Sequence, residues 1–113
     1  MASRTEQDMV RRALSIIGVV NVGADIAAED YEVARQSFET LCAELEARKV
    51  LYVPDRNAIE LRYFEPLAQI LAQRLAPDYG AEQAVEKIAL YEGVILQMAP
   101  VLRLPETGSV NFY

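Results

Sequence analysis

The side chains of this sequence that could perform chemistry are its carboxylates and one thiol. Glu82 and Glu86 are spaced to share one face of a helix, and paired acids can act as general acid and base when their pKa values are separated. Cys42 could act as a nucleophile, but the chain has no histidine to activate it. Glu82 and Glu86 fall on the polar side of their segment, so we interpret them as solvated carboxylates. Cys42 falls on the apolar side of its segment, so we interpret it as a core residue. We therefore expect no enzyme.

Metal and cofactor sites have no signature in this sequence. Histidine, the commonest metal ligand among side chains, is absent. No glycine-rich phosphate loop follows a strand-like run, and no spacing typical of metal ligands occurs. We expect neither a metal nor a cofactor.

Five aromatic side chains could form a stacking platform for single-stranded nucleic acid. They are Tyr52, Tyr63, Phe64, Tyr79 and Tyr91. Basic residues do not interleave them, so packing in the core or at a protein interface is the favoured interpretation.

Composition points to one folded acidic domain. The chain has 113 residues, of which 52% are hydrophobic and 25% charged, and its net charge is −6. Residues 29–46 contain six acids and one base, Arg35. Such a surface would repel phosphates, which disfavours tight direct binding to DNA or RNA.

No apolar run approaches the ~20 residues of a membrane span. The run Ala13–Ala24 follows two arginines, as the core of a signal peptide would. Glu6 and Asp8 stand where such a leader carries bases, so an amphipathic helix followed by a turn is favoured.

Helical periodicity dominates the first half of the chain. It predicts a helix over about Arg4–Ile17 that stops at Gly18, and a longer one over about Ile26–Lys49 with Asp25 as its N-cap. The apolar positions of these two helices are Val10, Ala13, Leu14, Ile17, Tyr31, Ala34, Phe38, Leu41, Cys42 and Leu45.

The connection to the next helix is expected to be extended or a short strand at Val50–Val53. Asn57 and Glu60 resemble a capping box. A third helix is expected from Asn57 or Glu65 to Ala76, its tight part beginning near Glu65 so that Pro66 falls in the first turn. Its apolar face is Leu67, Leu71 and Leu75 with Ala68, Ala72 and Ala76.

Residues Pro77–Gly80 should break the third helix, and a fourth should run over about Ala81–Met98 until Pro100. Its expected buried residues are Ala84, Val85, Ile88, Ile95 and Met98. The predicted fold is all-α: a small four-helix body (1–99) with an extended loop between helices 2 and 3, and an extended C-terminal arm (100–113).

The arm contains Leu-Pro-Glu-Thr-Gly, the pentapeptide cut by surface-anchoring transpeptidases. Such signals require a hydrophobic stop segment and a basic tail, whereas the five residues after Gly108 include no charge. We therefore interpret the match as fortuitous.

Three stretches together resemble a known family: "DMVRRALSIIGVV" (8–20), "ARQSFETLCAELEARKVLYV" (34–53) and "LAQRLAPDYG" (71–80). They are similar to the head-completion adaptors of short-tailed bacteriophages, the packaged-DNA stabilisation or tail accessory factor family. The Ala-Pro-Asp-Tyr turn is the most specific element. The closing "LPETGSVNFY" is similar to that family's Pro-Thr-Gly-Ser followed by an aromatic, with Glu106 as one extra residue.

The resemblance implies a virion protein of the head–tail junction, present in the host cytoplasm during assembly. Twelve copies would form a ring below the portal protein, extend the DNA channel, retain packaged DNA and receive the next tail (nozzle or hub) protein. DNA would pass through without specific binding, and no membrane would be involved. The implied portal-binding arm residues are Arg103, Leu104, Val110, Asn111, Phe112 and Tyr113.

From the charge count we further hypothesise that acids of the second helix face the channel and let DNA slide. The candidates are Glu29, Asp30, Glu32 and Glu39. Two other functions stay open: a small cytoplasmic helical partner-binding or regulatory protein, and a cell-wall-degrading accessory activity.

Overall fold

The computed structural model describes residues 3–21 and 23–98. The described helices are α1 (Glu6–Ile16), α2 (Ala28–Ala47), α3 (Leu61–Leu75), α4 (Val85–Met98) and a short 3-10 turn η1 (Ala76–Tyr79). Two strands of two residues each, β1 (Ser3–Arg4) and β2 (Ile59–Glu60), pair antiparallel. The predicted all-α class with four helices is confirmed, whereas the predicted arm, 100–113, lies outside the described residues.

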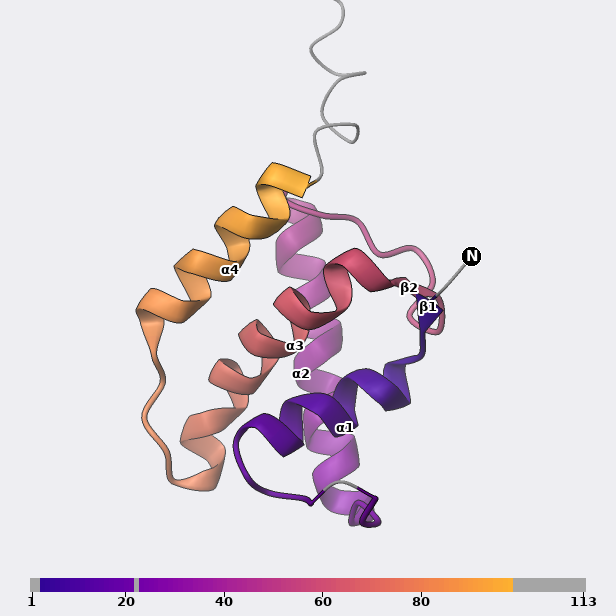
Figure 1. Ribbon diagram of the computed structural model, residues 1–113, viewed down its shortest axis with the longest axis vertical. Coiled ribbons are helices and arrows are strands. Elements are labelled where there is room, and N and C mark those ends of the chain that lie inside the picture. Colours follow the sequence, from indigo (N-terminus) through magenta and orange to yellow (C-terminus); the bar gives the residue numbers. More distant parts are fainter. Residues whose placement is uncertain (1–2, 22, 99–113) are drawn as a thin grey trace, which may run out of the picture.

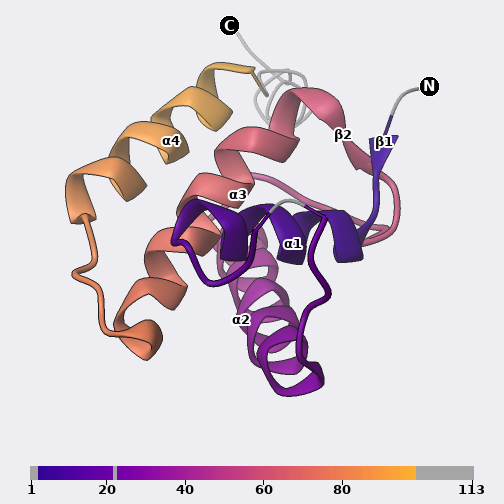
Figure 2. The same ribbon diagram turned by 60° about the horizontal axis from the view of Figure 1, so that its bottom comes forward.

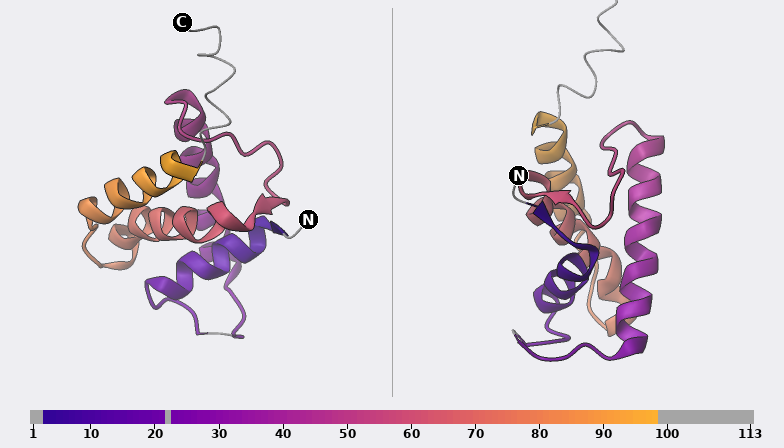
Figure 3. Two further views of the ribbon diagram at one scale, coloured as in Figure 1. Left: turned by 45° about the horizontal axis from the view of Figure 1, so that its top comes forward. Right: turned by 90° about the vertical axis from the view of Figure 1, so that its right-hand side faces the viewer.

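Helix α3 lies at the centre of the body. Figure 1 shows it between α1 and α4, with α2 crossing behind. Figure 3 shows α2 as a separate layer on one side, and α3 contacts all three other helices. Helix α4 has its main contacts with α3, at the edge of the molecule (Figure 2).

The core forms where α1, α2 and α3 meet. The predicted apolar face of α3 is buried throughout, and so are the predicted positions of α1 and α2 except Ile17 and Tyr31, which are half-buried. Cys42 is buried among them. Burial raises the pKa of its thiol to about 11, which keeps it protonated and makes it a small hydrophobic residue.

Helix α1 begins with a capping box. The Thr5 hydroxyl accepts from the Asp8 amide at 3.2 Å, and the Asp8 carboxylate accepts from the Thr5 amide at 3.1 Å. The helix ends where predicted, because Gly18 follows with a φ of 80° that L side chains rarely adopt.

The predicted start of the second helix is wrong. Helix α2 begins at Ala28 with Ala27 as N-cap, and Asp25 does not cap it. Ile26 packs against the core in an extended segment, so its burial takes precedence over an earlier helix start. The helix ends at Ala47, and Lys49 has a φ of 59° in the turn that follows.

The connection from α2 to α3 is extended, as predicted, and contains no strand at residues 50–53. Val50, Leu51 and Val53 are buried, so this loop is part of the core. The capping box predicted at Asn57 is wrong. The Asn57 side chain instead accepts from the Glu6 backbone amide at 3.3 Å, which ties the loop to the start of α1.

Helix α3 begins at Leu61, so the tight start predicted near Glu65 is also wrong. Pro66 therefore lies inside the helix, where its missing N–H leaves one carbonyl without an intrahelical partner. The earlier start buries Tyr63 and Phe64 on the core face, a gain of apolar burial that opposes this loss.

The break after α3 is as predicted: η1 covers Ala76–Tyr79 and Gly80 follows with a φ of 82°. Helix α4 starts at Val85 rather than Ala81. The preceding residues form a loop held by buried Gln73, whose side-chain oxygen accepts from the Ala84 amide at 2.8 Å.

The predicted core face of α4 is only partly correct. Ile95 is buried, but Ala84, Ile88 and Met98 are half-buried and Val85 is 64% exposed. Val85 lies ten residues before Ile95, which places it about 80° around the helix from that buried side chain. None of the helices described is both long and apolar enough to cross a membrane.

Candidate interaction surfaces

The candidate portal-binding residues, from Arg103 to Tyr113, lie outside the described residues. The described part of the chain therefore contributes the candidate acids of α2, an arginine-lined recess on α1, and the outer side of α4.

The four candidate acids do not form one face of α2. Asp30 and Glu39 are nine residues apart, which is two and a half turns, so they lie on opposite sides of the helix. Glu32 lies on the same side as Glu39, seven residues or about two turns away. Glu29 is exposed.

Arginines neutralise much of the acidic stretch. The Arg35 guanidinium holds Glu32 through two hydrogen bonds of 3.2 and 2.6 Å, and together with Gln36 lowers the pKa of Glu32 to about 2. Two arginines from beyond α2 also bind its acids. These pairs are Arg56 with Glu39 at 3.2 Å, and Arg74 with Glu44. The sequence count of six acids against one base therefore overstated the local charge.

Asp30 binds the most specific motif of the chain. The Tyr79 hydroxyl, from η1, donates to the Asp30 carboxylate at 2.8 Å. Partial burial, then this hydrogen bond, raises the pKa of Tyr79 to about 12. The Ala-Pro-Asp-Tyr turn thus fastens the end of α3 to the first turn of α2.

Two carboxylates meet between α1 and α2. Burial and then a hydrogen bond with Glu39 raise the pKa of Glu6. One oxygen of Glu6 is buried with no hydrogen-bond partner among the described residues. Arg35 and Arg56 oppose this shift, so the pair belongs to a mixed charge cluster.

A shallow recess of about 200 Å³ lies beside α1 on an otherwise acidic protein. Its lining consists of Arg4, Asp8, Arg11, Arg12, Ser15 and Phe64. Arg12 is bound to Glu65 by two hydrogen bonds of 3.0 and 2.8 Å, which lower the pKa of that carboxyl. The Arg4 guanidinium lies 5.4 Å from the centre of the Phe64 ring. Arg11 donates to the Ala24 carbonyl, so Arg4 is the arginine of the recess whose guanidinium has no hydrogen-bond partner among the described residues.

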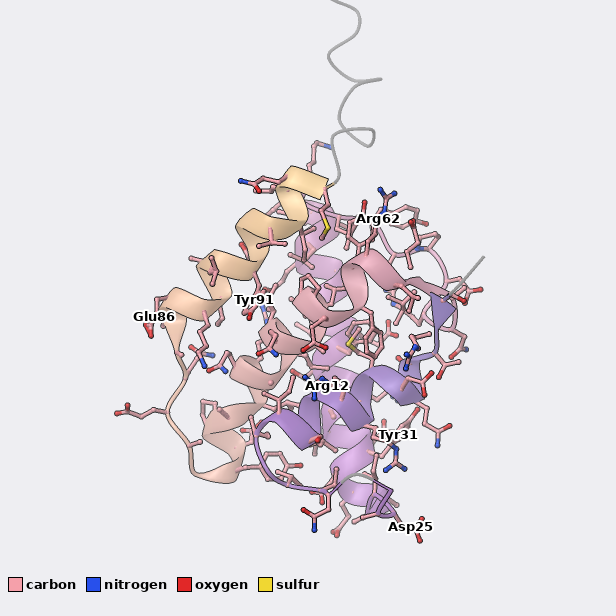
Figure 4. The ribbon with its side chains drawn as sticks, viewed as in Figure 1. Arg12, Asp25, Tyr31, Arg62, Glu86 and Tyr91 are labelled. Atoms are coloured by element: carbon pink, nitrogen blue, oxygen red, sulfur yellow. The ribbon has the colours of Figure 1, made fainter. Side chains whose placement is uncertain are left out.

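The acids considered for catalysis do not form a pair on one helix. Glu82 precedes α4, in the loop, whereas Glu86 lies in its first turn and points away from the body (Figure 4). Within residues 3–21 and 23–98, no three metal-ligating side chains come together.

The aromatic residues divide between core and surface. Tyr63 and Phe64 are buried, Tyr79 and Tyr91 are half-buried, and Tyr52 is 54% exposed. Figure 4 shows Tyr91 on the side of α4 that faces α3. Tyr63 and Phe64 share α3 but are buried, and the other three come from separate segments, so the five form no continuous platform.

The outer side of α4 is the surface that sequence reasoning missed. Leu90 is 59% exposed, and a side chain added at Gly93 would meet no atom within 4 Å. The signal was present in the sequence, because α4 is apolar around most of its circumference and a helix with one neighbour can bury only one side.

Comparison with protein-family models, with curated proteins and with solved structures gives no match to this chain. The resemblance to head-completion adaptors therefore depends on the three quoted stretches and the tail pattern.

Proposed function

We propose that this chain is a head-to-tail adaptor of a short-tailed bacteriophage. It binds below the portal ring, extends the DNA channel, retains packaged DNA and receives the next tail protein. The observation that carries the proposal is the Ala-Pro-Asp-Tyr turn, the most specific stretch of the resemblance. Its Tyr79 donates to Asp30, so the motif ties the end of α3 to the first turn of α2.

Binding is divided between the helical body and the arm. The body supplies rigid surfaces, whereas Val110, Phe112 and Tyr113 supply apolar anchors for the portal. Twelve-fold repetition would multiply a modest affinity for each copy.

The ion pairs of α2 change which of its acids could repel the phosphates of DNA in the proposed channel. Glu32 and Glu39 are bound to arginines, and Asp30 accepts from Tyr79. Glu29 is exposed and is the strongest of the four candidates for repelling phosphates. The proposed channel lining is therefore a weakly acidic surface around Glu29.

The test is to mix the purified protein with its portal and to examine the complex by electron microscopy and native mass measurement. We expect a ring with one copy per portal subunit. Deleting Val110–Tyr113 should abolish binding while leaving the helical circular dichroism spectrum unchanged.

A matched control is Tyr52→Ser, which removes an exposed aromatic from the body and should leave portal binding intact. Unchanged binding by the truncated chain would refute the role of the arm. A small oligomer with and without portal would instead favour the partner-binding regulator.

A further inference from the structure

A shallow hollow lies where the loop between α2 and α3 meets the start of α3. Its floor consists of buried Val53, Ile59 and Tyr63, and exposed Tyr52 and Ala58 lie on its rim. Its volume is about 30 Å³, and about 10–15 Å³ of such space holds one group the size of a water molecule. The hollow therefore fits the branched end of one aliphatic side chain.

The charged groups at the rim of this hollow are bound to each other. Glu60, which also lines it, accepts from Arg62 at 3.0 Å. The Arg62 guanidinium in turn lies 4.8 Å from the centre of the Tyr63 ring. An apolar occupant would therefore not strip water from an unpaired charge of Glu60 or Arg62.

The described part of the chain ends beside the hollow. The Tyr63 hydroxyl donates to the backbone carbonyl of Met98, the last residue described, at 3.3 Å. Figure 2 shows the end of α4 and the start of α3 at the same end of the molecule. Because Tyr63 also lines the hollow, the chain after Met98 starts within the length of one side chain from it. Three extended residues span up to about 10 Å, which is enough to enter it.

The residues that follow Met98 have the chemistry that the hollow accepts. Residues 99–102 are Ala-Pro-Val-Leu, all of them uncharged and apolar. A proline disfavours the helical conformation at the residue before it, so Pro100 favours departure from the axis of α4. Val101 and Leu102 both have the branched aliphatic end that the hollow can hold.

We propose that residues 99–102 dock in this hollow of the same chain and so fix the direction in which the arm leaves the body. A hollow of this size gives a weak contact. The segment is tethered beside it, however, and a short tether gives an effective concentration on the order of millimolar. An unlinked partner lacks this advantage, which makes the chain's own segment the occupant. The inference concerns the free protein and does not rest on portal binding.

The test is limited trypsin digestion of the folded full chain, with mass spectrometry to follow the cut after Arg103. Trypsin must take residues on both sides of Arg103 into its active site, so docking of residues 99–102 slows this cut. The rate then follows the fraction of molecules in which the segment is released. We expect the wild type to be cut at least about fivefold more slowly than a synthetic peptide of residues 97–108.

Two variants of the rim should remove this protection. Tyr52→Ser removes an exposed aromatic side chain, and Ala58→Glu places a charge at the rim. Both should bring the cut after Arg103 close to the rate of the peptide, with an unchanged helical circular dichroism spectrum, because both residues are exposed. Neither variant alters the sequence that trypsin cuts.

The matched control is Leu90→Ser, which removes an apolar side chain from α4 that is 59% exposed, compared with 54% for Tyr52. It should be cut at the wild-type rate.

Four results would overturn the proposal. The first is a wild type that is cut as fast as the peptide, and the second is a wild-type rate in either rim variant. The third is a faster cut in Leu90→Ser, which would indicate that the segment lies on α4 instead. The fourth is protection that disappears on dilution, which would indicate that the segment binds a second copy of the chain.

Discussion

Helices α3 and α4 are both rich in apolar residues, yet one is buried and the other is half-exposed. Most side chains of α3 are buried, because α1, α2 and α4 surround it. In α4 only Ile95 is buried, since its main neighbour is α3 alone. The composition of a helix therefore sets how much apolar surface it could bury. The number of neighbouring helices sets how much of that surface is buried.

Shortening one apolar side chain in each helix should give the largest difference between α3 and α4. Leu71→Ala in α3 removes a fully buried side chain and should lower the free energy of unfolding by about 2–5 kcal/mol. Leu90→Ala in α4 removes an exposed one and should change it by less than about 0.5 kcal/mol. Urea denaturation at low protein concentration measures both. Similar losses would contradict the assignment of α3 as the central helix.

The attachment of α4 to α3 should be weakened by changing Gln73. Gln73→Ala removes the acceptor for the Ala84 amide and should cost about 1–3 kcal/mol, because a part-buried donor loses its partner. Amide hydrogen exchange should accelerate at Ala84 and in the first turn of α4, with α1 and α2 unaffected. Gln97→Ala, an exposed glutamine on α4, is the matched control. Equal effects of the two would show that Gln73 does not anchor the loop.

The smallest effect should come from the ion pair between α2 and α4. Arg48 donates to Glu92 at 2.9 and 2.7 Å, and its side chain is half exposed, so Arg48→Ala should cost only about 0.2–1 kcal/mol. A double-mutant cycle with Glu92→Gln measures the coupling.

The same pair has a defined pH dependence. Arg48 lowers the pKa of Glu92 below 4.5, so the stabilisation is complete above that value and is lost as the pH falls through the folded-state pKa. The wild type and Arg48→Ala should therefore converge in stability in acid. A difference that persists in acid would point to packing by the arginine stem instead.

Periodicity was sufficient where an element packs one regular face. It predicted the buried face of α3, the end of α1 at Gly18 and the position of Cys42. It failed at Val85, which lies about 80° around α4 from buried Ile95 and is exposed. The short strands β1 and β2 have only two residues each, too few to show a period.

The candidate acids show that a count of charges along the sequence is limited in the same way, because it misses partners from distant segments. Residues 29–46 include one base, Arg35, but folding brings Arg56 and Arg74 to Glu39 and Glu44 from distant segments. No local count could include them, because these contacts join residues up to 30 positions apart.

The sequence by itself determined that this chain forms four helices, which residues line most of the core, and that its charge is acidic. Those properties follow from spacing and composition along the chain. Only the tertiary structure decided which acids are paired, that Tyr79 holds Asp30, and that Leu90 of α4 is exposed among the described residues. The physical reason is that pairing and exposure depend on which segments become neighbours, and the packing of the other three helices around α3 settles that.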